Sequence, residues 1–255
     1  MKQRPYILLT NDDGINAQGL AALRKAFESF GDVMVAAPDR ECSAAGHAIT
    51  LRKPIRVHQI DKTIFEIEGT PTDCVLIAIC SLMDRRPDLV ISGINHGPNL
   101  GDDVTYSGTV GAAMEGALWG IPSVAISVVG QEHGSLSVAA RIGVRLVKQI
   151  LQQKVPRKPL LNVNVPDLPE DRIRGVRVTK LGRRGRFAEE LVTRKTDAHG
   201  AVRYWIGGEE PAWIGDAQTD TTAIEEGYVS VTPLRLDWTH DETMASLDSW
   251  EDLAL

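Results

Sequence analysis

The chain has 255 residues, of which 43% are hydrophobic and 24% are charged, and this composition is typical of a globular protein with a sizeable core. Its formal net charge of −6 argues against the broad basic surface that binds duplex nucleic acid, although one local pocket can still be positive. No apolar stretch reaches the roughly 20 residues that span a bilayer. We therefore expect a protein that contacts neither a membrane nor duplex nucleic acid.

Two hydrophobic periodicities alternate along the first two-thirds of the chain. Continuous short apolar runs predict strands buried on both faces of a parallel sheet, and apolar residues at helical spacing predict helices. The predicted strands are residues 6–10, 32–38, 87–95, 122–128 and 160–166. The predicted helices are residues 17–31, 69–82, 107–120 and 136–151. Thr70, Pro71 and Asp73 suit the first positions of the second helix. This order predicts an α/β fold with a Rossmann-like three-layer core and a mostly parallel sheet.

After about residue 167 the pattern changes to short strands separated by polar turns, with a hairpin expected around Asp197–Gly200. We treat residues 1–255 as a single domain. Its parts are a core of about 1–166, an arm of about 175–215, and a C-terminal strand and tail of about 216–255. The arm has little core of its own, and such arms often pair with another subunit.

The three cysteines, Cys42, Cys74 and Cys80, form no C-x-x-C pair, so we expect reduced thiols and no zinc site. The N-terminal apolar run ends after a few residues at Asn11, which is too short for a signal peptide. Together these features predict a cytoplasmic protein.

Polar side chains follow three of the predicted strands. Ligands of a parallel sheet bind beyond the carboxyl ends of its strands, so these side chains are candidates for one site. They are Asp12 and Asp13 after the first strand, Ser43 after the second, and Asn95, His96 and Asn99 after the strand at 87–95. Carboxylate, hydroxyl and amide oxygens suit Mg²⁺, Mn²⁺ or Ca²⁺ better than zinc. A cation between the adjacent acids would also relieve their mutual repulsion.

The Ser107-Gly108-Thr109 turn opens a predicted helix and offers hydroxyls and free backbone N–H groups, which suit a phosphate. A metal site beside a phosphate site indicates hydrolysis of phosphate esters.

Each of these motifs also has a structural interpretation. The two acids followed by glycine can form a helix cap and a tight turn, Asn95 and Asn99 can form Asx turns, and Ser107 can merely cap its helix. His96 and Arg40 are ordinary loop residues on this interpretation. The coincidence of the motifs on adjacent loops favours a site.

Several segments, in chain order, resemble the SurE family, the survival-protein nucleotidases. They are "ILLTNDDGINAQGL", "VAAPDRECSAAGHAIT", "GTPTDCV", "ISGINHGPNLGDDVTYSGTVGAAMEGALWGIPSVAIS", "LNVNVP" and "GYVSVTPL". The resemblance is collinear over nearly the whole chain. It implies a metal-dependent phosphatase that acts on nucleoside 5′- and 3′-monophosphates, with some activity on short polyphosphate. It also implies homodimers or homotetramers built partly by exchanged, or swapped, C-terminal elements.

The resemblance assigns roles to particular residues. Asp12, Asp13, Ser43 and Asn95 match the family's ligands to one divalent ion per subunit, Mg²⁺ or Mn²⁺, with Ca²⁺ as an alternative occupant in a crystal. The phosphate contacts match Asn99, Ser107, Gly108 and Thr109. Of these two sets, Asp12, Asp13, Asn99 and Ser107 are the expected catalytic residues. Cys42 departs from the usual arginine or glutamine, which affects contacts at the rim rather than the metal ligands.

The mechanism we expect is attack by a water that the metal activates, with Asn99, Ser107 and Thr109 stabilising the charge on the phosphoryl oxygens. Attack by Asp12 or Asp13 itself ranks lower because metal ligation occupies their lone pairs. A phosphatase of the haloacid-dehalogenase type is disfavoured, because that chemistry uses two acids separated by one residue. A non-catalytic sensor of nucleotides remains an alternative.

Overall fold

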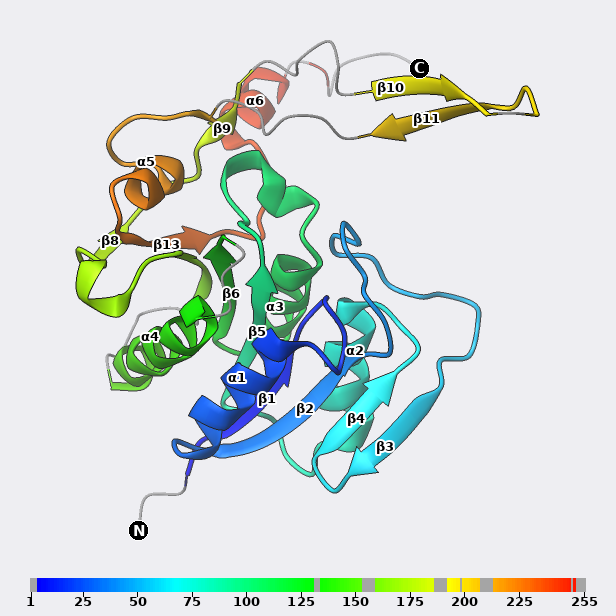
Figure 1. Ribbon diagram of the computed structural model, residues 1–255, viewed down its shortest axis with the longest axis vertical. Helices are drawn as coiled ribbons and strands as arrows, with labels where there is room; N and C mark the ends of the chain where they lie inside the picture. The colour runs from blue at the N-terminus through cyan, green and yellow to red at the C-terminus, as the bar shows by residue number, and fades with distance from the viewer. Residues whose placement is uncertain are drawn as a thin grey trace.

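The computed structural model describes residues 4–130, 134–152, 159–185, 192–197, 199–206, 213–248 and 250. Its centre is a nine-stranded sheet in the order β3-β4-β2-β1-β5-β6-β7-β13-β8, which Figure 1 shows with helices packed against it. The strands of this sheet are β1 (Tyr6–Thr10), β2 (Asp32–Pro38), β3 (Val57–Asp61), β4 (Ile64–Ile67), β5 (Leu89–His96), β6 (Ser123–Val129), β7 (Leu160–Pro166), β8 (Val176–Val178) and β13 (Val229–Leu234). From β4 to β7 all neighbouring strands are parallel, as the apolar runs predicted.

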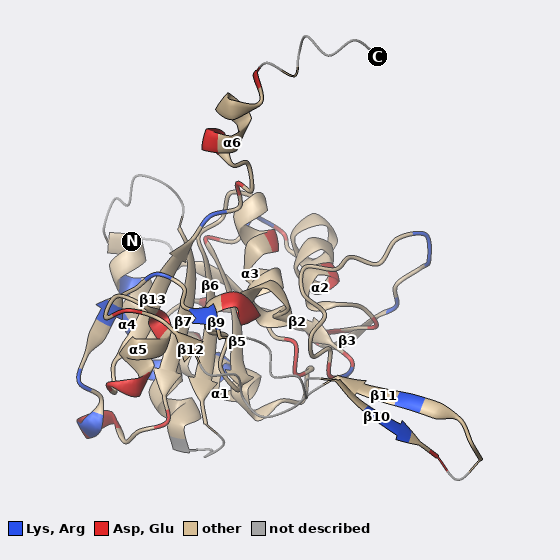
Figure 2. Cartoon of the chain, turned by 90° about the horizontal axis from the view of Figure 1, so that it is seen from above, with Lys and Arg blue, Asp and Glu red and all other residues tan. Residues whose placement is uncertain are grey.

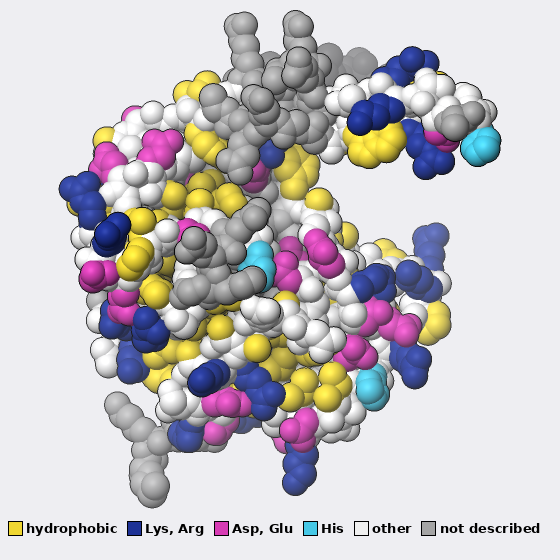
Figure 3. Space-filling view, viewed as in Figure 1, with side chains coloured by type: hydrophobic (Ala, Val, Ile, Leu, Met, Phe, Trp, Pro, Cys, Tyr) yellow, Lys and Arg dark blue, Asp and Glu magenta, His cyan; other side chains and the backbone are white. Residues whose placement is uncertain are grey.

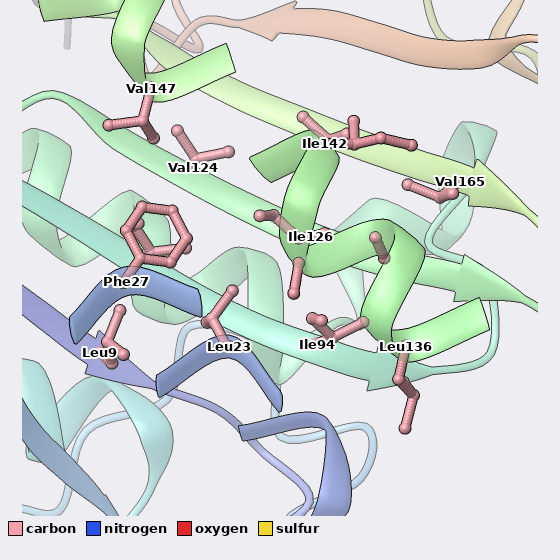
Figure 4. Packing of buried hydrophobic residues seen from close by; sticks show 14 of the residues in the cluster. Leu9, Leu23, Phe27, Ile94, Val124, Ile126, Leu136, Ile142, Val147 and Val165 are labelled. Atoms are coloured by element: carbon pink, nitrogen blue, oxygen red, sulfur yellow. The ribbon is translucent and has the colours of Figure 1, made fainter. Parts of the chain in front are cut away.

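Helices cover both faces of the sheet, so the predicted three-layer α/β fold is confirmed. The helices are α1 (Gln18–Glu28), α2 (Pro71–Ile77), α3 (Gly108–Leu118), α4 (Gly134–Gln152), α5 (Asp220–Glu225) and α6 (Asp241–Ser246). Successive residues of a strand point to opposite faces, and β1 shows the consequence. Ile7 and Leu9 pack with α1 and α4, whereas Leu8 packs with α2. Figure 4 shows Leu23 and Phe27 of α1 in the first of these two cores.

The start of α2 shows how local sequence sets a boundary. Thr70 Oγ1 accepts a hydrogen bond of 3.1 Å from the Asp73 backbone N–H, and Asp73 Oδ2 accepts one of 2.9 Å from the Thr70 N–H. Pro71 occupies the first helical position, where no donor is needed. The predicted cap is therefore confirmed, and a π-helical turn at Ala78–Leu82 extends the helix to its predicted end.

The C-terminal third is more mixed than the predicted arm. β8 joins the edge of the main sheet, parallel to β13. β9 (Arg183–Arg184) pairs with β12 (Trp213–Ile214), and β10 (Val192–Thr196) pairs with β11 (Val202–Ile206) in the predicted hairpin. This β10–β11 hairpin projects from the body in Figures 1 and 2, and Figure 2 shows Lys or Arg on both of its strands. The exchange of C-terminal elements between subunits remains a prediction, because β13 here pairs within its own chain.

The elements that were not predicted include the β3–β4 ribbon and helix α6. Strand β3 was missed because each of its residues is exposed and it carries no buried apolar periodicity, whereas β4 alternates between buried and half-buried residues over only four positions. Helix α6 likewise has no buried residue. Among the described helices, none is both long and apolar enough to cross a bilayer.

Candidate active site

The carboxyl ends of β1, β2 and β5 meet at one edge of the sheet, because β1 lies between the other two strands. The chain runs outward from β1 to β2 and β4, then returns to β5 on the other side, so this edge is a topological switch point. A cavity of about 580 Å³ opens there. Seven of the residues that the sequence made candidates line it: Asp12, Asp13, Ser43, Asn95, His96, Asn99 and Ser107.

Asp12 is a buried carboxyl whose side chain is held by the start of α3. Its Oδ1 accepts a short hydrogen bond from the Thr109 hydroxyl. The pKa of Asp12 is raised to about 6, mainly by burial; the Thr109 hydrogen bond opposes this rise and the neighbouring charge of Asp13 adds to it. A Cβ on Gly108 would lie 2.9 Å from the Asp12 Cβ, so only glycine lets α3 approach this closely. The Asp12 carboxyl is therefore held in one position. Burying its negative charge is unfavourable, and a nearby cation would offset that cost.

Asp13 supplies the observation that tests the metal assignment. Its Oδ2 is buried, and it has no hydrogen-bond partner among the described residues. Burial raises the pKa of Asp13, interactions with His96 lower it, and the charge of Glu41 raises it. A buried carboxylate oxygen without a partner is unfavourable unless a positive group binds it. The residues present thus fit a divalent cation.

Ser43 and Asn95 have neutral oxygens left for the same cation. Ser43 donates its hydroxyl proton to Glu41 Oε1 at 2.6 Å, which leaves lone pairs on the serine oxygen. The Asn95 amide nitrogen donates to the Gly97 carbonyl at 2.9 Å, which leaves the amide oxygen as the remaining polar atom. This hydrogen bond is local, within two residues of Asn95, as expected if the side chain also stabilises a turn.

Asn99 is fixed by side chains that the sequence analysis did not assign to the site. Its backbone N–H donates to Asn164 Oδ1 at 2.9 Å, and its amide nitrogen donates to Ser127 Oγ at 2.7 Å. Its carbonyl accepts bonds of 2.7 Å from Asn162 and 3.0 Å from Asn164. The sequence contained a sign of this support. Asn162 and Asn164 are two residues apart in an otherwise apolar strand, so their side chains must lie on the same face.

The Ser107–Thr109 turn divides into different roles. Ser107 caps α3, since its Oγ accepts a bond of 3.1 Å from the Val110 N–H, and its hydroxyl proton remains for a ligand in the cavity. Gly108 and Thr109 do not line the cavity, and the Thr109 hydroxyl is already bonded to Asp12. Phosphate contacts by Gly108 and Thr109 therefore remain predictions for their backbone N–H groups.

The lining residues to which the sequence assigned no role include Asp103, Tyr106 and Arg184. Arg184 is the one Lys or Arg among the described residues that line this cavity, and it forms an ion pair with Asp103. The pair is anchored by a 2.8 Å bond from the Arg184 N–H to Asp102. No local pattern marks Arg184, because it reaches the site only through the pairing of β9.

The four candidate ligands, Asp12, Asp13, Ser43 and Asn95, offer two carboxylates, one hydroxyl and one amide oxygen, while Glu41 and Asp103 on the same wall accept from Ser43 and pair with Arg184. In the part of the chain that the structure describes, no group of three or more His, Cys, Asp or Glu residues is placed to hold a metal. The candidate ligands are all oxygen donors, which suits a hard cation that keeps open positions for water or substrate.

Comparison with known proteins places the chain in a family. A profile of the family described as Survival protein SurE matches residues 7–187. The chain belongs to the SurE family. It is 48% identical over 246 residues to the 5′-nucleotidase SurE of Geobacter sulfurreducens, covering 96% of this chain and 93% of that one. It is also 45% identical over 250 residues to the 5′-nucleotidase SurE of Aquifex aeolicus, covering 97% and 99%.

The fold agrees with the same family. A crystal structure of a SurE protein from Aquifex aeolicus superposes with a TM-score of 0.86 at 44% sequence identity, covering 97% of this chain and 100% of that chain. The family resemblance and the α/β fold expected from the sequence are thus both confirmed.

Proposed function

We propose that this SurE chain is a divalent-metal-dependent phosphomonoesterase that hydrolyses nucleoside 5′- and 3′-monophosphates to nucleoside and phosphate, with secondary activity on short polyphosphate. The SurE relatives named 5′-nucleotidase support the reaction class. Asp13 Oδ2 has no hydrogen-bond partner among the described residues and belongs to the neighbour of the buried Asp12, and this observation carries the metal assignment, because a cation next to the two acids would offset their burial and their mutual repulsion.

The residues of the cavity fall into a metal-binding group and a phosphate-binding group. Asp12, Asp13, Ser43 and Asn95 would hold one Mg²⁺ or Mn²⁺. When bound, such an ion supplies charge for a phosphoryl oxygen and lowers the pKa of a coordinated water. Asn99, locked by Asn164 and Ser127, presents its remaining amide N–H to the phosphate without further ordering.

The rest of the cavity wall serves the phosphate. Ser107 donates its hydroxyl proton, and its own oxygen is already turned toward the Val110 N–H. Arg184 adds a positive group on the wall, and Asp103 fixes that group in place. Donors that are preorganised in this way stabilise developing charge at little reorganisation cost.

The test is phosphate release from AMP by the purified protein. We expect release with Mn²⁺ or Mg²⁺, complete loss after treatment with EDTA, and recovery when excess Mn²⁺ is added. Inorganic tripolyphosphate in place of AMP measures the secondary activity. Failure to release phosphate from any nucleoside monophosphate with either metal would favour a non-catalytic sensor.

We also propose that the protein forms homodimers or homotetramers through the β10–β11 hairpin. The hairpin stands clear of the body in Figure 3 and exposes large apolar side chains. Tyr204 is 64% and Ile206 is 84% exposed, which is costly for a free surface. Replacing both with lysine should lower the molecular mass measured by light scattering and leave the circular dichroism unchanged. An unchanged mass would contradict the assignment of this surface.

The thiols bear on location. Cys42, Cys74 and Cys80 are all free, which supports our proposal of a reducing, cytoplasmic compartment.

A further inference from the structure

A second cavity adjoins the one that holds the acids. Its volume is about 860 Å³, larger than the 580 Å³ of the first. His96, at the end of β5, lines both cavities. A ligand that occupies both cavities would therefore contact His96.

The two cavities differ in chemistry. Acids, amides and a hydroxyl line the first. Much of the second is apolar or aromatic, through Pro98, Leu100, Val129, Trp213 and Ile224. The second cavity also contains two polar groups, Thr221 and Glu225, on helix α5. An aromatic and aliphatic wall with a few polar groups is the usual form of a pocket for a small organic ligand.

Trp213 is held firmly enough to act as a platform. A Cβ built on Gly101 would lie 2.8 Å from Cζ3 of Trp213, so the indole ring rests against the glycine backbone. Trp213 is also directly opposite Arg184 in the β9–β12 pair, and the two strands lie side by side in Figure 2. Residues opposite each other in an antiparallel pair place their side chains on the same face. One two-stranded ribbon thus contributes Arg184 to the first cavity and Trp213 to the second.

We propose that the second cavity binds the nucleoside half of the substrate, with the base stacked on Trp213 and an N–H of the base or an O–H of the sugar donating to Glu225. This inference rests on the proposed nucleotidase function and extends it by a specificity site. A nucleotide has the matching polarity, because its phosphate is strongly charged and its base is a flat aromatic ring. A sugar joins the phosphate to the base, and His96 is the residue that the two cavities share.

The experiment compares two substrates that share a phosphate end. AMP carries a base, and ribose 5-phosphate does not. Base stacking on an aromatic side chain is typically strong enough that Trp213→Ala should raise KM for AMP about ten-fold. KM for ribose 5-phosphate should stay within about two-fold, since that substrate never reaches the indole ring. Trp213→Phe keeps a stacking surface and should restore most of the affinity for AMP.

A control and a binding measurement separate this inference from the proposed function. Trp238→Ala removes an indole that is 83% exposed and lines neither cavity, and it should change neither KM. Adenosine binding, measured by calorimetry without turnover, should weaken about ten-fold in Trp213→Ala.

The outcomes are distinct. Equal changes of KM for both substrates, or no change for AMP, would overturn the base site and leave the nucleotidase function standing. Adenosine that fails to bind the wild-type protein would do the same. Adenosine binding without phosphate release from either substrate would instead reject the proposed function.

Discussion

Asp13→Ala is expected to lose nearly all phosphate release from AMP, by roughly two to three orders of magnitude, because a bound metal ion stabilises transition-state charge by several kcal/mol. The fold should be retained. Burial already raises the pKa of Asp13, and its Oδ2 has no hydrogen-bond partner among the described residues, so the folded chain gains little from this carboxylate. Steady-state kinetics at saturating Mn²⁺, with circular dichroism on the same samples, measures both effects.

The matched control is Asp39→Ala. Asp39 follows the neighbouring strand β2, does not line the cavity, and pairs with the exposed Arg40 at 2.9 Å. The two variants remove the same charge at the same end of the sheet. Activity of Asp39→Ala should stay close to wild type, and calorimetry should detect loss of Mn²⁺ binding in Asp13→Ala alone. An Asp13→Ala protein with near-normal turnover would refute the metal assignment.

Asp220→Ala is expected to cause the largest loss of stability. The carboxylate is fully buried, and its Oδ1 accepts hydrogen bonds of 2.7 Å from the Gly182 N–H and 2.9 Å from the Thr221 N–H. Its Oδ2 accepts one of 2.9 Å from the Gly101 N–H. Alanine leaves these three donors without a partner, at a cost of about 1–3 kcal/mol for each buried group. Burial of the charged carboxylate is itself unfavourable, as the raised pKa of Asp220 shows, and its removal offsets part of this cost. We therefore expect a net loss of about 3 kcal/mol in the free energy of unfolding, measured by urea denaturation.

Activity should fall in the same variant. Gly101 begins the 3₁₀ turn Gly101–Thr105 that leads to Ser107, and Gly182 directly precedes β9, which carries Arg184. Loosening both segments disturbs two walls of the cavity at once. Asp216→Ala is the control, because this acid lies in the same segment but is exposed and paired with Lys180 at 2.6 Å. Its denaturation midpoint should match the wild type. Equal midpoints for both variants would show that Asp220 does not join these segments.

Local sequence was sufficient for much of the fold. Apolar runs identified β1, β2, β5, β6 and β7 within a few residues, because a strand buried on both faces must be apolar at every position. Helices α1 and α4 followed from the spacing of residues such as Leu23 and Phe27. The exposed strand β3 and helix α6 left no such signal. Their residues are exposed to solvent, so no apolar periodicity is needed at these positions.

The candidate site was predicted in the same uneven way. Asp12, Asp13, Ser43 and Asn95 follow strands, so their shared position could be inferred from strand ends alone. The division between Ser107, which faces the cavity, and Thr109, which bonds Asp12, depends on the rotation of α3 about its axis. That rotation is set by packing against the sheet, and no residue pattern near the turn records it.

The sequence by itself determined the fold class, the edge of the sheet where the chemistry lies, and the hard-oxygen character of the site, because each of these follows from periodicity and from residues next to strand ends. Only the tertiary structure decided which distant residues complete the site. Asn164 supports Asn99 across 65 residues, and Arg184 pairs with Asp103 through β9. Contacts of this kind depend on strand order and long-range pairing, which arise from burying the whole core at once rather than from any short segment.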